Sequence, residues 1–289
     1  MKKRPAFKCG TLLFYSVLMY RKKYLAVLLC ATSVLPAAFE HTFLSPMNAG
    51  LGLSYVNFNR NILGTIMDPA SLAQGNRIQF AGQTGRRFNL KPLTHQNFVG
   101  GLPTRWGHFG FGIQTFGMKQ YTESTISIAF GKRLKQRVQG GFAVNMYSLS
   151  IPDYGSATSV GISLAWHIDL NGWIQWGTIL HNINKPAIGV TKDFLPQIII
   201  TALSFHPTKN ISTQLEWEQD TIYQGHLKAG FSFKPRKWLM VHTGFVSGTG
   251  QVTGAIGLNI YQFNLNYAMA NHPNLGPSHW MGFNIPLGK

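Results

Sequence analysis

The stretch Ile211-Ser-Thr-Gln-Leu-Glu-Trp-Glu218 alternates apolar and polar side chains without a break. A period of two predicts a β-strand with one apolar face and one polar face. The same alternation returns at 126–130, 160–170, 226–233 and 262–269. It therefore dominates the chain, and the fold class follows from it.

Runs of this kind continue from residue 77 to the C-terminus, separated by turn signals such as 151–155, 182–186 and 206–210. We count about 14 strands, many of them near the ~9–11 residues that a tilted transmembrane strand requires. An even count closes the sheet with both of its ends on the periplasmic side, and closure removes exposed strand edges. The sequence therefore predicts an all-β fold, a single antiparallel transmembrane β-barrel over residues 77–289.

The composition supports a barrel in the outer membrane of a Gram-negative cell. Hydrophobic residues make up 45% of the chain and charged residues only 12%, about half of the charged share of a soluble domain. No uninterrupted apolar run reaches the ~18 residues that suggest a transmembrane helix. Each strand signal is weak by itself, so a soluble β-sandwich stays open as an alternative.

Residues 1–38 resemble a secretion signal. The basic residues 21–23 precede an apolar run, which ends in small residues by Ala38. This order is typical of a signal peptide, and the apolar run is short for a membrane anchor. Either Met1 or Met19 is compatible with this pattern as the start of translation.

The formal net charge of +17 does not indicate nucleic-acid binding. Seven basic residues and no acidic residue lie before residue 39, and the other basic residues are spread singly along the chain. A nucleic-acid site needs a clustered basic face, so we expect contact with anionic membrane lipid instead. Both cysteines, Cys9 and Cys30, also fall in the leader, which excludes disulfides and thiolate sites from the mature chain.

The polar faces of the predicted strands carry few groups that suggest catalysis. Glu216 and Glu218 share one strand face about 7 Å apart, beside Lys228 of the next strand, and we expect a charge network in the lumen. His167 and Asp169 also share a face, but no third ligand or nucleophile accompanies them. We therefore predict a protein that is not an enzyme and that uses no cofactor or metal.

Aromatic and small residues occupy positions that suit a barrel wall. The glycines of 107–112 alternate with Phe109 and Phe111, which predicts glycines facing the lumen. Most tryptophans lie near strand ends, where an aromatic girdle would meet the membrane surface. The seven tryptophans are Trp106, Trp166, Trp173, Trp176, Trp217, Trp238 and Trp280.

Residues 39–76 lack strong alternation, and we expect them to form a short N-terminal plug or hatch. Within them, Asp68-Pro-Ala-Ser-Leu-Ala73 follows a Gly-rich stretch at 50–64. It resembles the Asn-Pro-Ala-Gly-Leu-Ala element near the N-terminus of FadL-type and PorV/PorQ-type outer-membrane barrels. The matching positions are Asp68, Pro69, Ala70, Leu72 and Ala73, with Asp68 standing for the usual Asn and Ser71 for Gly.

A second segment near the C-terminus resembles the PorV/PorQ pattern of Tyr-Ala followed by Leu-Gly-x-Thr-His-Arg. The matching positions are Tyr267, Ala268, Leu275, Gly276, Ser278 and His279. Ser278 stands for Thr and Trp280 for Arg, which leaves the subfamily open.

The resemblance implies an accessory protein of type IX secretion, whose partners are the translocon and the C-terminal domains of cargo. FadL-type relatives instead transport hydrophobic or small solutes, which is the main alternative. The short chain and modest loops favour the secretion hypothesis. A structural barrel or a barrel enzyme is the remaining possibility.

Overall fold

A computed structural model describes residues 38–40, 43–59, 61–190, 192–221 and 224–287. The predicted signal peptide lies outside these residues apart from Ala38, so it stays a prediction. No helix among the described residues is long and apolar enough to cross a membrane.

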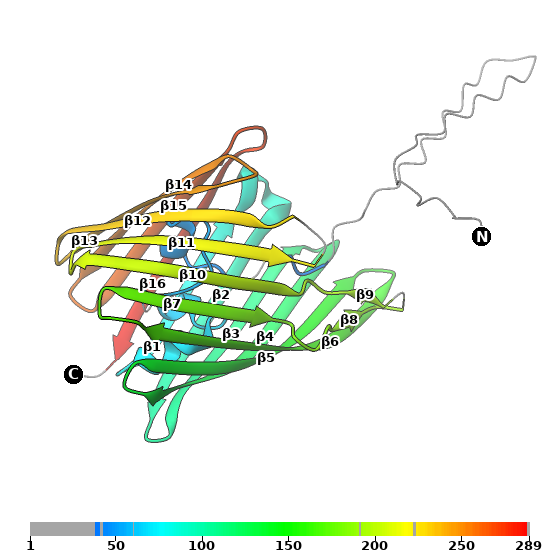
Figure 1. Ribbon diagram of the computed structural model, residues 1–289. Coiled ribbons are helices and arrows are strands. Elements are labelled where there is room, and N and C mark those ends of the chain that lie inside the picture. The colour runs from blue at the N-terminus through cyan, green and yellow to red at the C-terminus, as the bar shows by residue number, and fades with distance from the viewer. Residues whose placement is uncertain (1–37, 41–42, 60, 191, 222–223, 288–289) are drawn as a thin grey trace, which may run out of the picture. The chain divides into compact units, whose positions relative to one another are not determined.

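Fourteen antiparallel strands close into one barrel (Figure 1). This confirms the predicted fold class. Each strand pairs with its two neighbours, and the first pairs with the last to close the wall. In order around the wall the strands are β1 (Ile78–Arg86), β2 (Thr94–Thr104), β3 (Gly107–Met118), β4 (Tyr121–Lys135), β5 (Val138–Ile151), β6 (Gly155–Asp169), β7 (Ile174–His181), β10 (Ile198–Thr208), β11 (Ile211–Asp220), β12 (His226–Arg236), β13 (Leu239–Val246), β14 (Gln251–Ile260), β15 (Phe263–His272) and β16 (Gly276–Leu287).

The remaining elements are short. Strands β8 (Ala187–Ile188) and β9 (Asp193–Phe194) form a small hairpin in the loop between β7 and β10. The helical elements are α1 (Pro46–Gly50), η1 (Ile62–Gly64), η2 (Pro69–Gln74), η3 (Arg87–Asn89) and η4 (Lys91–Leu93).

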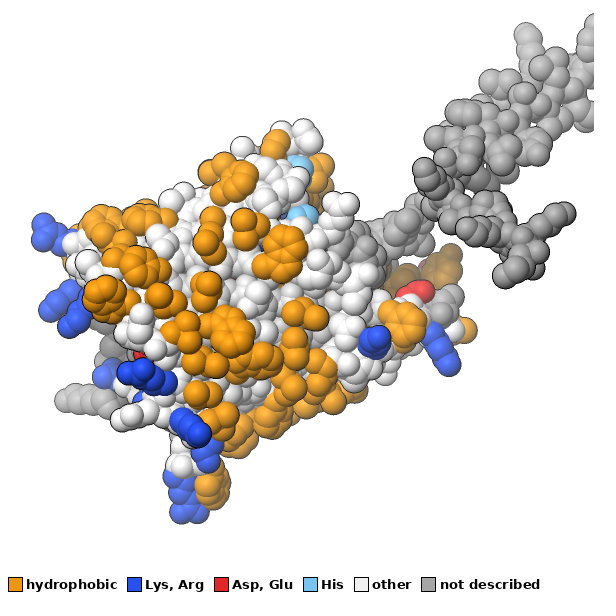
Figure 2. Space-filling model, in the orientation of Figure 1, with side chains coloured by type: hydrophobic (Ala, Val, Ile, Leu, Met, Phe, Trp, Pro, Cys, Tyr) orange, Lys and Arg blue, Asp and Glu red, His pale blue; other side chains and the backbone are white. Residues whose placement is uncertain are grey.

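The alternating apolar and polar residues of the sequence form the outer and the inner face of the barrel wall. On β11, Leu215 and Trp217 point outward and are 55% and 45% exposed, whereas Glu216 between them is 1% exposed. Similar outward apolar residues cover the barrel, as Figure 2 shows for one side. A water-soluble monomer rarely exposes so broad an apolar surface, whereas a barrel wall that faces the lipid bilayer needs an apolar outer surface. The protein is therefore an outer-membrane β-barrel.

The two ends of the barrel differ. At the end where β1 begins and β16 ends, which we call the terminal end, two-residue connections such as 136–137 and 209–210 join the strands. The opposite end, the loop end, carries the longer connections 87–93 and 182–197. Short turns of such barrels face the periplasm and longer loops face outward, so the terminal end is the periplasmic end.

Basic residues gather at the terminal end, and we call this set the basic rim. It consists of Arg77, Arg105, Lys132, Arg133, Lys135, Arg137, Lys209, Lys234, Arg236 and Lys237. In Figure 2 blue side chains lie at this left-hand end, where Figure 1 marks the C-terminus. Among the described residues, Asp169 is the one acidic side chain beside these turns.

The predicted aromatic girdle is present in part. Trp106, Trp173 and Trp238 are exposed in the turns of the terminal end. Trp280 departs from the prediction, since it points into the lumen and is buried. The reason is register: Met281 takes the outward position on β16, so its neighbour must face inward.

Candidate functional site

The lumen of the barrel is filled by residues 38–40, 43–59 and 61–76, which we call the luminal segment. Helix α1 packs on β13–β16, η1 on β1 and β2, and η2 on β3–β6. Buried apolar side chains of the segment, including Phe43, Ile66 and Leu72, form a core with inward wall residues such as Ala129 and Ile200. The barrel is therefore a packed structure with no straight aqueous path along its axis through these residues.

Inward glycines of the wall make room for the luminal segment. A Cβ atom on Gly141 would lie 2.4 Å from the carbonyl carbon of Pro69, and one on Gly244 would lie 2.1 Å from the amide nitrogen of Gly52. At these two points the backbone of the wall is therefore in contact with the backbone of the luminal segment. At Gly110 the neighbour is a side chain, because Cδ1 of Leu72 would lie 3.0 Å from such a Cβ. The prediction that the glycines of 107–112 face the lumen is confirmed for Gly110, since it is buried next to the exposed Phe109.

Asp68 joins the luminal segment to the wall. All five residues of its motif, 68–70 and 72–73, are buried. Its Oδ2 atom accepts a hydrogen bond from the Asn57 backbone N–H at 2.7 Å and lies 2.8 Å from Nε2 of His167 on β6. His167 and Asp169 do not form a joint site, because Asp169 instead accepts from the backbone N–H of Gly172 at 2.6 Å.

Glu216 is the second point of attachment. Its carboxylate accepts hydrogen bonds from the Ser54 hydroxyl at 2.5 Å and from the backbone N–H groups of Tyr55 and Val56 at about 3.0 Å. Lys228 lies 3.3 Å from Glu216, pairs with Glu218, and donates to the Leu53 carbonyl at 2.7 Å.

The residues Glu216, Glu218 and Lys228 thus form one cluster, as the sequence suggested, and the cluster also holds the luminal segment. The sequence contained no signal for that second role. Apart from the Ser54 hydroxyl, the partners on residues 53–56 are backbone groups, and backbone groups leave no mark in a side-chain pattern.

The C-terminal motif does not form a compact site. Tyr267 and His279 face outward and join by a 2.9 Å hydrogen bond between the Tyr267 hydroxyl and Nδ1 of His279. Ala268 and Ser278 face the lumen and are buried. Leu275 and Gly276 lie at the turn between β15 and β16, where Gly276 has a φ of 84°. The motif residues therefore divide between both faces of the wall and the loop end.

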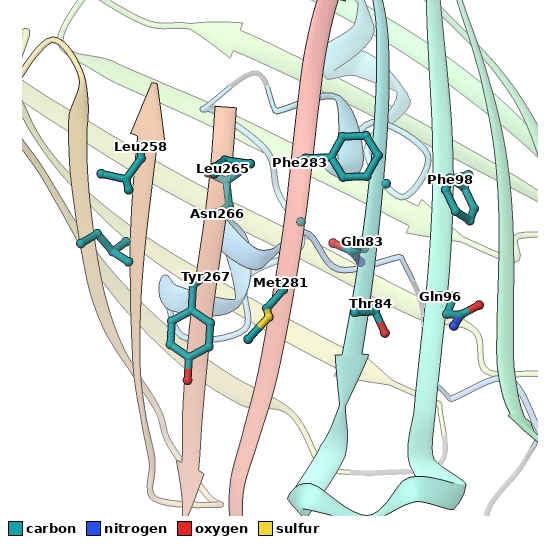
Figure 3. A pocket seen from close by; sticks show the side chains of 13 residues that line it. Gln83, Thr84, Gln96, Phe98, Leu258, Leu265, Asn266, Tyr267, Met281 and Phe283 are labelled. Carbon is teal, nitrogen blue, oxygen red and sulfur yellow. The ribbon is translucent and has the colours of Figure 1, made fainter. Parts of the chain in front are cut away.

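Two hollows lie on opposite sides of the same part of the wall. Inside the barrel, a cavity of about 70 Å³ is lined by Tyr55, Arg87, His95, Trp280 and neighbouring side chains. Outside, a groove of about 680 Å³ runs across β14, β15, β16, β1 and β2. Figure 3 shows Leu265, Met281 and Phe283 on the β15–β16 side of this groove and Phe98 beyond β1. We call these the inner cavity and the outer groove.

Glycines thin the wall between the inner cavity and the outer groove. Gly82 on β1 pairs with Phe283 on one side and with Phe98 on the other, and both rings reach across it. Gly85 lies beneath the inward side chains of His95 and Trp280. The β1–β16 and β1–β2 pairings have no register shift, so the wall is closed here and is one backbone thick at these glycines.

No group of three or more His, Cys, Asp or Glu side chains within the described ranges could hold a metal ion. Some polar groups of the lumen, such as Asp68 and Glu216, attach the luminal segment to the wall, and others, such as Ser127 and Asn145, bond to each other along the wall. Two of the hollows among the described residues are the inner cavity and the larger, apolar outer groove.

Comparison with known proteins finds likeness in fold and none in sequence. No protein-family model matches the chain, and no curated protein matches it. Among solved structures, the toluene transporter TbuX of Ralstonia pickettii has a TM-score of 0.64 at 9% identity, over 84% of this chain and 98% of that one. The toluene transporter TodX of P. putida has a TM-score of 0.61 at 9% identity, over 79% and 95%.

A FadL homologue of Pseudomonas aeruginosa is also similar, with a TM-score of 0.58 at 8% identity over 84% of this chain and 98% of that chain. At such identities the likeness concerns the fold alone. The chain has the 14-stranded fold of FadL-type outer-membrane barrels.

Proposed function

We propose that this protein transports small hydrophobic solutes across the outer membrane and releases them sideways into the bilayer. The observation that carries the proposal is the outer groove, an apolar hollow of about 680 Å³ on the lipid-facing wall, beside Gly82 of β1. The fold shared with two toluene transporters supports the same function.

A sideways route suits the packing of the barrel. The luminal segment fills the axis, so a solute moving straight through would displace a buried apolar core. The inner cavity, by contrast, lies directly across the wall from the outer groove, and both are bounded by β2, β15 and β16. An apolar solute that crosses there leaves a cavity of mixed lining for the apolar outer groove and never meets the periplasm, and the hydrophobic effect favours that direction.

The secretion-accessory hypothesis stays a prediction, because no feature of the structure tests it. It rests on two short motifs. One of these, Asp68–Ala73, is buried under the wall, where a folded cargo domain has no access. The other is divided between the two faces of β15 and β16. Transport is therefore the function that the geometry supports better.

Uptake by whole cells tests the proposal. Gram-negative cells producing the protein should take up radiolabelled toluene faster than cells with an empty vector. Thr84→Trp places an indole in the outer groove and should bring uptake back to the empty-vector rate. The matched control is Gly254→Trp, on the outward face of β14 beyond the groove lining, where an added Cβ has no neighbour closer than 3.7 Å.

Both variants must show the faster migration of a folded barrel in unboiled gels. If wild type does not exceed the empty vector, or if the two tryptophan variants transport equally, the proposed route is wrong.

A further inference from the structure

We propose that the basic rim binds anionic phospholipid headgroups of the inner leaflet, so that the protein carries its own shell of acidic lipid at the periplasmic surface. The rim lies at the terminal end, which the short turns assign to the periplasm. This inference does not depend on whether the barrel transports solutes.

The arrangement of the rim fits a flat surface. Lys135 and Arg137 lie at the β4–β5 turn, and Arg236 and Lys237 lie at the β12–β13 turn. Four strands separate these turns in one direction around the closed wall and six in the other. Charges on opposite sides of a ring cannot converge on one compact ligand, but exposed members on both sides of it, such as Lys132 and Lys237, can touch a surrounding leaflet.

Aromatic side chains next to the basic rim indicate at which depth in the membrane the rim residues lie. The guanidinium of Arg105 lies 4.5 Å from the centre of the Trp106 ring, and Lys237 precedes the exposed Trp238. Tryptophans of membrane barrels lie at the level of the lipid headgroups. Cations beside them are therefore at the depth of the phosphates. Lys132 follows Phe130 on the same lipid-facing side of β4, and a lysine there extends its ammonium toward the headgroups.

The charge of the rim is not neutralised by the protein. Within the described ranges, no ion pair of the structure involves a rim residue, whereas Lys228 in the lumen is paired with Glu216 and Glu218. The loop end is different, because basic residues such as Lys119 and Lys192 are accompanied there by Asp153, Asp193 and Asp220. An excess of positive charge at one membrane surface attracts acidic lipids, and salt screens this attraction.

An acidic periplasmic protein is the competing partner for such a surface. It would contact one sector of the ring and leave the other sector unbound, whereas lipid would contact both. Removing charge from one sector at a time therefore distinguishes the two partners.

The test uses the folded protein in nanodiscs of phosphatidylcholine, with or without phosphatidylglycerol. One rim variant combines Lys132→Gln, Arg133→Gln, Lys135→Gln and Arg137→Gln; a second combines Lys209→Gln, Lys234→Gln, Arg236→Gln and Lys237→Gln. The control removes four charges from the loop end through Arg86→Gln, Lys91→Gln, Lys119→Gln and Lys185→Gln. Native mass spectrometry counts the phosphatidylglycerol molecules retained, and the gel shift on heating gives the midpoint of unfolding.

We expect wild type and control to retain phosphatidylglycerol and to unfold at a higher temperature when it is present. Each rim variant should bind it roughly tenfold or more weakly, while unfolding as wild type does in phosphatidylcholine alone. High salt should remove the difference. If phosphatidylglycerol has no effect on wild type, or the control loses as much binding as the rim variants, the inference is wrong. Loss of phosphatidylglycerol in only one of the two rim variants would also overturn it, because lipid around the barrel contacts both sectors.

Discussion

Nε2 of His167 on strand β6 lies 2.8 Å from Oδ2 of Asp68 in the luminal segment, and both side chains are buried. The two residues are 99 positions apart in the chain. The contact joins the segment that fills the barrel to the wall that encloses it. Any opening of the lumen must either break this contact or move Asp68 and His167 together.

Asp68→Asn should loosen the luminal segment without unfolding the barrel. The amide keeps an acceptor for the Asn57 N–H but removes the charge facing His167. A charge-assisted hydrogen bond is about twice as strong as a neutral one, a loss of ~1 kcal/mol, or roughly fivefold in an opening equilibrium. Recordings in planar bilayers should show correspondingly more frequent openings. The exposed Asp153→Asn is the control, and equal recordings for both variants would contradict this role for Asp68.

Glu216→Gln should release residues 54–56. The carboxylate accepts from two backbone N–H groups and one hydroxyl there, and hydrogen bonds to a charged group contribute about 1.5–3 kcal/mol. Amide hydrogen exchange at Tyr55 and Val56 should therefore quicken by roughly 10- to 100-fold. Glu218→Gln is the control, because Glu218 pairs with the same Lys228 from outside this hydrogen-bonded group. Unchanged exchange in the Glu216 variant would show that other contacts hold the segment.

Gly141→Val should destabilise the folded protein through overpacking. Its Cβ would lie 2.4 Å from the backbone of Pro69, and forced overpacking costs about 1–3 kcal/mol. Gly254→Val places the same side chain on the outer face, where its Cβ has no neighbour closer than 3.7 Å and a β-branched residue suits a strand. The midpoint of the heat-induced gel shift should fall only for Gly141→Val. A fall of equal size in both variants would point to the loss of glycine itself.

Leu215→Arg tests whether the apolar face of β11 meets lipid. The side chain is exposed near the middle of the strand, where an arginine facing hydrocarbon costs about 2–4 kcal/mol. An exposed leucine of a soluble protein would tolerate the same change. Urea unfolding in lipid vesicles measures the loss, with Tyr154→Arg at the β5–β6 turn as control. Equal stability of the two variants would contradict the membrane-spanning orientation.

Much of the wall could be predicted from the sequence because its signal is local. The alternation in residues 211–218 already divides Leu215 and Trp217 from Glu216, since neighbouring side chains of a strand must point to opposite faces. The same rule predicts where Trp280 points once Met281 is known to face lipid. The strand count and the closed sheet follow from repeating this pattern and from the need to pair every strand edge.

The contacts of the lumen were decided by tertiary structure alone. The sequence pairs Glu216 with Lys228 through adjacent strands, but it contains nothing to join Glu216 to the backbone of Tyr55, Asp68 to His167, or Gly141 to Pro69. Those contacts arise when the closed wall surrounds the luminal segment and brings distant residues together. The outer groove has the same origin, because it exists only where β1 closes against β16 and places Gly82 between Phe98 and Phe283. Which side chains face the lipid and which face the lumen is set by the geometry of a single strand. Cavities, and the contacts between the luminal segment and the wall, depend instead on which distant segments become neighbours when the barrel closes.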